Sequence, residues 1–230
     1  MLFHGSGANS SIWLRDIAAF SRDHRVYAVD MIGEPGFSAE TRPLLASDAH
    51  AAWLDDVWRA LGVTRASVVG VSLGGWLAVD YAIRRPHNVS ALSLIAPSGI
   101  GRQNHSLLVQ AALLLVLGEW GRRRALRLVS GPVPLPPEIA EFVVAIFRHF
   151  RPRMERLPLR TDDELAGLSM PVQLILGRND AMIRSAETRE RMERLTANLH
   201  LTWLEDAGHV LGGQAARVLD FLGRNRVAAA

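Results

Sequence analysis

The chain has 230 residues, of which 49% are hydrophobic and 21% are charged, as expected for one soluble globular domain with a sizeable core. Its net charge is only +3, and all 26 cationic residues are arginine. The absence of lysine excludes Schiff-base chemistry, a Ser–Lys dyad and a P-loop lysine. The absence of cysteine likewise excludes disulfides and thiol catalysis.

Neither a membrane nor a nucleic acid is an expected partner. The most apolar segment, Leu107–Leu117, is interrupted by Gln110 and is shorter than the roughly 20 residues that span a bilayer. The arginines are scattered, apart from Arg122–Arg124, and form no basic stripe with interleaved aromatic residues. The first residues, MLFHGSG, lack the basic-then-apolar layout of a signal peptide, so we expect a cytoplasmic protein.

Short β-type runs alternate with helical patterns along most of the chain, which predicts an α/β fold with a mostly parallel sheet between flanking helices. The expected strands are Met1–Phe3, Arg25–Val29, Ser67–Gly70, Ser90–Ile95, Val172–Leu176 and His200–Leu204. The expected helices are Ile12–Phe20, Asp48–Leu61, Leu73–Arg84, Ala186–Leu195 and Gln214–Leu222.

This alternation stops between Ser98 and Ser169. The interval contains apolar runs at helical spacing and a proline-rich break over residues 131–137, but no β-type run, and it is too long for a loop. The helical runs are Leu107–Leu117, Ala125–Val129 and Ile139–Phe147. We therefore expect a helical cap (98–169) inserted into an α/β core formed by residues 1–97 and 170–230. Its apolar face, with Leu113 or Leu114, is expected to line an acyl pocket.

One short stretch, VVGVSLGGW at residues 68–76, places a serine between two glycines where a strand becomes a helix. Two interpretations compete: Ser72 is displayed for nucleophilic attack, or a tight turn happens to contain a serine. Glycine is required beside Ser72 under the first interpretation, because side chains would collide with the neighbouring strand and helix.

Polar motifs follow three other predicted strands. His4-Gly5-Ser6-Gly7 comes after the first, Asp180 follows Leu176-Gly177-Arg178-Asn179, and Asp206-Ala207-Gly208-His209 follows the last. His4 is expected to brace its own loop, and Asp206 to cap a turn rather than to pair with His209. The remaining histidines show no metal-ligand spacing.

The motifs HGSG (4–7), GVSLG (70–74), GRND (177–180) and DAGH (206–209), with the acidic, glycine-bearing loop Asp30–Ser38, resemble those of the α/β-hydrolase superfamily. The likeness covers essentially the whole chain. Within the superfamily, the chain resembles bacterial serine carboxylesterases with a helical lid. It implies that Ser72 is the nucleophile, His209 the base and Asp180 the acid that orients it. It also implies that the backbone N–H groups of Ser6 and Leu73 receive the oxyanion, with no cofactor and no metal.

A serine nucleophile forms an acyl-enzyme, so we expect a small, largely apolar carboxylic ester as substrate. Cleavage of a carbon–carbon bond, a lactone or an amide stays open. Carbon–carbon bond hydrolases commonly carry tryptophan after the catalytic histidine, whereas Val210 follows His209 here. A hydrolase-fold protein that only binds a ligand is the alternative from another class.

Members of the superfamily usually place further strands before the oxyanion loop, which starts here at residue 4. We therefore expect Arg25–Val29 to lie at the edge of the sheet with unpaired backbone groups. The chain is then either a truncated reading of a longer protein or one that hides this edge by forming a homodimer.

Overall fold

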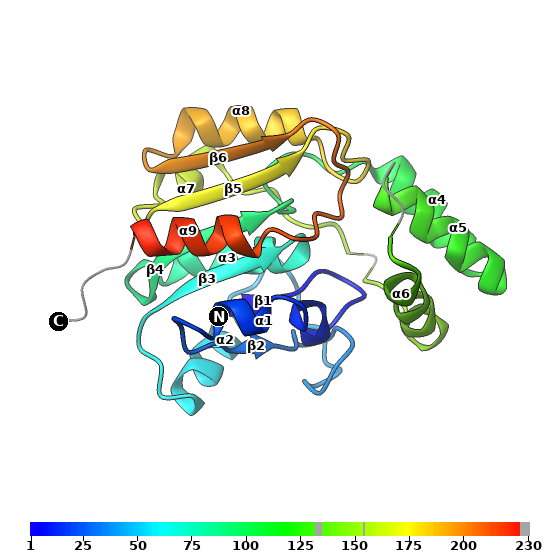
Figure 1. Cartoon of the computed structure of the whole chain (residues 1–230), viewed down its shortest axis with the longest axis horizontal. Coiled ribbons are helices and arrows are strands. Elements are labelled where there is room, and N and C mark those ends of the chain that lie inside the picture. Colours follow the sequence, from blue (N-terminus) through cyan, green and yellow to red (C-terminus); the bar gives the residue numbers. More distant parts are fainter. Residues whose placement is uncertain (132–134, 154, 226–230) are drawn as a thin grey trace.

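The structure, a computed structural model, describes residues 1–131, 135–153 and 155–225. Within this part of the chain, six strands form a parallel sheet in the order β2-β1-β3-β4-β5-β6 (Figure 1). The strands are β1 (Leu2–Phe3), β2 (Ala28–Val29), β3 (Ala66–Val71), β4 (Val89–Ile95), β5 (Val172–Gly177) and β6 (Leu199–Leu204). The predicted α/β fold is confirmed.

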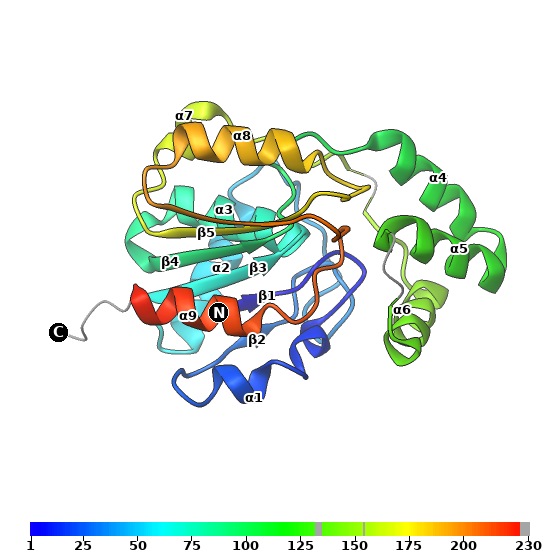
Figure 2. The ribbon, with the colours of Figure 1, turned by 45° about the horizontal axis from the view of Figure 1, so that its top comes forward.

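Helices cover both faces of this sheet. Helices α1 and α9 pack together on one face, while α2, α3 and α8 lie on the other (Figure 2). The helices are η1 (Ser10–Trp13), α1 (Ile17–Phe20), α2 (Ala49–Ala60), α3 (Leu73–Arg84), η2 (Pro86–Asn88), α4 (His105–Leu115), α5 (Gly118–Ser130), α6 (Pro137–His149), α7 (Asp162–Ala166), α8 (Ser185–Leu195) and α9 (Ala215–Arg224). In the described residues, none of them has the length and apolar character needed to cross a membrane.

The central strands are buried along nearly their whole length. All six residues of β5 are buried, as are six of the seven residues of β4. A parallel sheet with helices on both faces has no solvent-facing side, which explains why these strands appear in the sequence as continuous apolar runs rather than as an alternating pattern. All six strands end at the same sheet edge, so the loops that carry the polar motifs meet there.

Two predicted elements near the N-terminus were wrong in extent. The single helix expected over Ile12–Phe20 is a 3₁₀ turn, η1, followed by the one-turn helix α1. The side chain of Asn9 caps η1, and the N–H of Ser10 donates to Asp30 Oδ1 at 2.7 Å, so the start of this segment is tied to a loop. Local hydrogen bonds of this kind compete with a continuous helix.

Strand β2 is shorter than expected, because it pairs only with the two residues of β1. It lies at one edge of the described sheet, where the sequence placed it. Association of two copies along this edge stays a prediction.

The interval between β4 and β5 contains four helices in its described residues. Helices α4 and α5 form an antiparallel hairpin, and α5 packs on α6; together they extend outward from the carboxyl edge of the sheet (Figures 1 and 2). Residues 132–134 of the proline-rich break lie outside the described residues.

The last part of this interval packs against the core instead. Leu165 of α7 is fully buried in the hydrophobic core. The Arg160 guanidinium forms an ion pair with the buried Asp80 of α3 at 2.7 Å and lies over the Trp76 ring, 4.9 Å from its centroid. Removing either member of such a buried pair leaves an uncompensated charge. Arg160 therefore fixes the returning chain to the helix that follows Ser72.

Candidate active site

Ser72 occupies a sharp turn between β3 and α3. Its backbone has φ 52° and ψ −112°, a conformation that side chains rarely adopt and that costs about 1–3 kcal/mol. Two hydrogen bonds hold the turn: the Ser72 N–H donates to the Ile95 carbonyl at 3.0 Å, and the Ser98 N–H donates to the Ser72 carbonyl at 3.1 Å. The neighbouring strand and the loop after it thus maintain the strained conformation.

The glycines beside Ser72 allow very close backbone contacts. A Cβ atom on Gly70 would lie 2.3 Å from the Gly74 carbonyl oxygen. A Cβ on Gly74 would lie 2.5 Å from the carbonyl oxygens of Phe3 and His4. Both separations are far below van der Waals contact, so a side chain at either position would collide with the backbone, as expected from the sequence.

A continuous hydrogen-bonded chain joins three of the predicted residues. His209 Nε2 lies 3.0 Å from Ser72 Oγ, and His209 Nδ1 lies 2.7 Å from Asp180 Oδ2. These residues are 137 and 29 positions apart in the sequence and meet because each follows the carboxyl end of a strand.

Backbone donors fix the second oxygen of Asp180. The N–H groups of Met182 and Ile183 donate to Asp180 Oδ1 at 2.8 and 3.0 Å. The side chain of Asp180 is fully buried and that of His209 is 8% exposed, whereas Ser72 is only half-buried. The carboxylate is therefore held in one orientation, and the serine remains open to a small molecule.

Asp206, the other carboxylate near His209 in the sequence, is exposed to solvent. The acceptor 2.7 Å from His209 Nδ1 is Asp180 Oδ2. The structure thus favours Asp180 over Asp206 as the partner of the imidazole.

The loop His4–Gly7 lies beside the serine. A Cβ atom built on Gly5 would lie 3.5 Å from the Cβ atom of Ser72. His4 Nε2 accepts the Met31 N–H at 2.9 Å, so the His4 proton is on Nδ1, which donates to the Gly5 carbonyl at 2.8 Å. Burial lowers the pKa of His4 and keeps the ring neutral. His4 therefore braces this loop, as the sequence predicted.

Sequence reasoning missed two residues that contact this loop. Glu34, 7% exposed, accepts hydrogen bonds from the Gly7 N–H at 2.8 Å and from the Ser6 hydroxyl at 3.2 Å. Phe147 of α6 packs on Gly7, where an added Cβ would lie 2.3 Å from its ring. The loop Asp30–Ser38 is part of the resemblance to the superfamily, but no local pattern in the sequence distinguishes Glu34 within it. No pattern links Phe147 to a loop 140 residues away.

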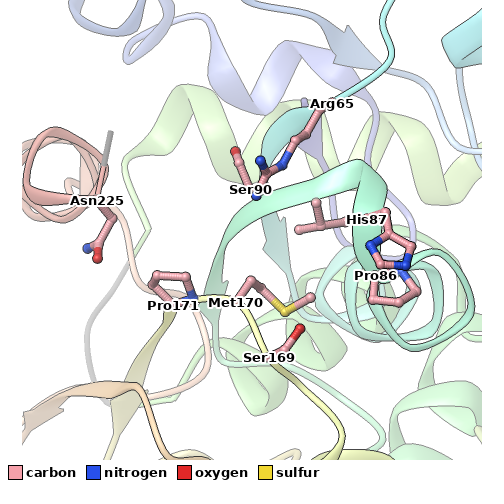
Figure 3. Close-up of a pocket in the computed structure, with 9 residues that line it drawn as sticks. Arg65, Pro86, His87, Ser90, Ser169, Met170, Pro171 and Asn225 are labelled. Carbon is pink, nitrogen blue, oxygen red and sulfur yellow. The ribbon is translucent and has the colours of Figure 1, made fainter. Parts of the chain in front are cut away.

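The described residues contain no group of side chains suited to hold a metal ion. A cavity of about 480 Å³ lies at the opposite, amino edge of the sheet, between the residues that precede β4 and β5 (Figure 3). Its walls include Arg65, His87, Ser90, Met170 and Asn225. None of the three hydrogen-bonded residues Ser72, Asp180 and His209 lies there, so this cavity is separate from the candidate active site.

The fold and the arrangement of loops at its carboxyl edge are those of a hydrolase, and the chain belongs to the alpha/beta hydrolase family, whose model matches residues 1–221. It is 30% identical to carboxylesterase YbfK of Bacillus subtilis, over 96% of this chain and 79% of that protein. The crystal structure of that carboxylesterase, CesB (YbfK), superposes with a TM-score of 0.85, over 96% of this chain and 82% of that one. The chain is therefore carboxylesterase-like.

A second structure similar to this chain is also that of a carboxylesterase. The crystal structure of naproxen esterase (carboxylesterase NP) from Bacillus subtilis has 26% sequence identity and a TM-score of 0.83, over 97% of this chain and 81% of that one. A meta-cleavage product hydrolase from Pseudomonas fluorescens, at 20% identity and a TM-score of 0.79, shares the fold. Together the carboxylesterase relatives indicate a hydrolase that acts on esters.

Proposed function

We propose that the protein is a serine hydrolase that cleaves a carboxylic ester of a small, largely apolar molecule through an acyl-enzyme. The observation that carries this proposal is the hydrogen-bonded chain from Ser72 Oγ through His209 to Asp180. The carboxylesterase relatives support the ester as the bond that is cleaved.

In the acylation step, Ser72 Oγ attacks the acyl carbon while His209 Nε2 takes the hydroxyl proton. Asp180 accepts the hydrogen bond from Nδ1–H and stabilises the imidazolium that forms. His209 then gives the proton to the alkoxide leaving group, and the C–O bond of the ester breaks. The acyl group remains on Ser72.

In the second step, His209 removes a proton from water, and the resulting hydroxide attacks the acyl carbon. The acid leaves, and the proton returns to Ser72 Oγ. No cofactor or metal enters either step.

The oxyanion of both tetrahedral intermediates would accept hydrogen bonds from the backbone N–H groups of Leu73 and Ser6. Leu73 is the first residue of α3, where an N–H has no acceptor within the helix. Ser6 is exposed in the loop beside Ser72. Losing one such donor typically costs about 3 kcal/mol of activation free energy.

A ligand-binding protein without catalysis is the alternative from another class. It would gain nothing from the strained conformation of Ser72 or from a buried carboxylate aligned on His209. Cleavage of a carbon–carbon bond is less well supported, because Val210 is 44% exposed and follows His209 where those enzymes commonly place tryptophan.

The test is hydrolysis of p-nitrophenyl esters from acetate to decanoate. We expect a burst of p-nitrophenol equal to the enzyme concentration, followed by a slower steady state, as for acyl-enzyme turnover. Binding of the esters without release of p-nitrophenol would favour the non-catalytic alternative.

A further inference from the structure

The carboxylate of Glu34 joins two loops at the carboxyl edge of the sheet. Glu34 lies in the loop after β2, and its Oε2 atom accepts both the Gly7 N–H (2.8 Å) and the Ser6 hydroxyl (3.2 Å). The same two loops are joined again by the bond from the Met31 N–H to His4 Nε2, at 2.9 Å. The segment that carries the Ser6 N–H is thus held at both ends.

These bonds restrict the directions in which the Ser6 N–H can point. The Gly7 N–H belongs to the peptide plane that follows the Ser6 Cα, and its bond to Glu34 fixes that plane. The bond from the hydroxyl fixes the Ser6 side chain. The preceding peptide plane contains both the Ser6 N–H and the Gly5 carbonyl, and His4 Nδ1 donates to that carbonyl at 2.8 Å. With the planes on both sides of the Ser6 Cα held, the Ser6 N–H has little freedom to turn.

A buried carboxylate is a costly way to hold a loop. Burial raises the pKa of Glu34, and the hydrogen bonds from Gly7 and Ser6 and the positive charges of Arg42 and Arg153 only partly offset that effect. A charged acceptor, however, forms hydrogen bonds roughly twice as strong as those of a neutral one. The buried carboxylate therefore lowers the stability of the fold but holds Ser6 firmly in place.

We propose that Glu34 is a positioning residue for the oxyanion hole: its carboxylate holds Ser6 and Gly7 so that the Ser6 N–H faces the acyl oxygen of the substrate. This inference rests on the proposed serine hydrolase function. It assigns to Glu34 an effect on the transition state and none on the binding of the ground-state ester.

The test compares Glu34→Gln and Glu34→Ala with the wild-type enzyme, and uses Glu164→Gln as the matched control. Glu164 also accepts a backbone N–H, that of Thr161 at 2.7 Å, but in α7. We expect kcat for a p-nitrophenyl ester to fall about 10- to 100-fold in the Glu34 variants, with KM within about twofold, since a misplaced oxyanion donor costs less than a missing one. Glu164→Gln should keep wild-type kcat.

Two further readouts separate positioning from a structural role. The rate of inactivation by a p-nitrophenyl alkylphosphonate, whose tetrahedral adduct places an oxygen in the oxyanion hole, should fall in parallel with kcat. Because the raised pKa means that ionised Glu34 costs folding free energy, Glu34→Gln should melt no lower than wild type at neutral pH.

A kcat within twofold of wild type in both Glu34 variants would overturn the proposal. The proposal would also be overturned if both variants lost kcat only together with a large drop in melting temperature, since Glu34 would then only stabilise the fold. If Glu34→Ala fails to fold, the isosteric Glu34→Gln decides. A wild-type enzyme inert to both ester and phosphonate would refute the proposed function itself, and this inference with it.

Discussion

Helices α3 and α5 are similar in length but differ in their surroundings. In α3, the ten residues Leu73–Ala82 are all buried, and the helix begins at Ser72. In α5, only Gly121, Ala125 and Ser130 are buried, and the helix is joined to α6 by the exposed ion pair of Arg123 with Glu141. Burial on all sides fixes the position of α3, whereas exposed ion pairs contribute little to stability.

The difference suggests that the packed core and the exposed helices have different functions. The proposed catalytic residues lie where closely packed neighbouring elements hold them in place. Substitutions there should strongly lower activity or stability. The proposed selection of substrate falls to helices α4–α6, where the side chains have room to change.

Ser72→Ala should abolish ester hydrolysis, with kcat falling by about 10⁴- to 10⁶-fold, because it removes the hydroxyl that lies 3.0 Å from His209 Nε2. Steady-state assays with p-nitrophenyl acetate measure the loss, and circular dichroism checks that the fold is retained. Turnover near the wild-type rate by a folded variant would contradict the assignment of the nucleophile.

Asp180→Asn should lower kcat by roughly 10⁴-fold, because the amide no longer holds His209 in the tautomer that accepts the serine proton. Asp206→Asn, at an exposed carboxylate three residues before the same histidine, is the matched control and should stay within about twofold. A larger loss for Asp206→Asn than for Asp180→Asn would reverse the assignment of the acid.

Gly74→Ala should lower the free energy of unfolding by about 1–3 kcal/mol, because the new methyl group would collide with the carbonyl oxygens of Phe3 and His4. Gly223→Ala in α9 is the control: its Cβ meets no atom within 4 Å, so better helix propensity should raise stability by roughly 0.5–1 kcal/mol. Urea denaturation measures both. Equal effects would mean that the turn at Ser72 is less tightly packed than described.

Substitutions in α4 and α6 should change acyl-chain preference with little loss of stability. Phe147→Ala removes a ring that lies against Gly7, and we expect its optimum among p-nitrophenyl esters to move to longer acyl chains. Polar substitution of Leu113, which is 64% exposed, or of Leu114 should change the profile less. Identical chain-length profiles for all three variants and wild type would show that these helices do not contact the acyl group.

The sequence predicts the parts of this molecule that depend on local pattern. The apolar runs of β3, β4 and β5 and the glycines around Ser72 have direct steric causes, so their positions could be anticipated. The one-turn helix α1 and the short strand β2 could not, because they depend on distant residues. The bond from the Ser10 N–H to Asp30 ties the start of the η1–α1 segment to a loop, and β2 is only as long as its pairing with β1.

The same distinction applies within the site. Ser72, Asp180 and His209 each follow a predicted strand, so topology alone brings them to one edge. Glu34 and Phe147 reach the oxyanion loop through side-chain contacts that leave no pattern in the sequence.

The central claim is that His209 activates Ser72 as a nucleophile. Its most direct test is to treat the enzyme with a p-nitrophenyl alkylphosphonate and to locate the adduct by peptide mass spectrometry. We expect one phosphonyl group per chain, on Ser72, with no labelling of Ser72→Ala and strongly slowed labelling of His209→Ala. An adduct on another residue, or equal labelling rates with and without His209, would contradict it.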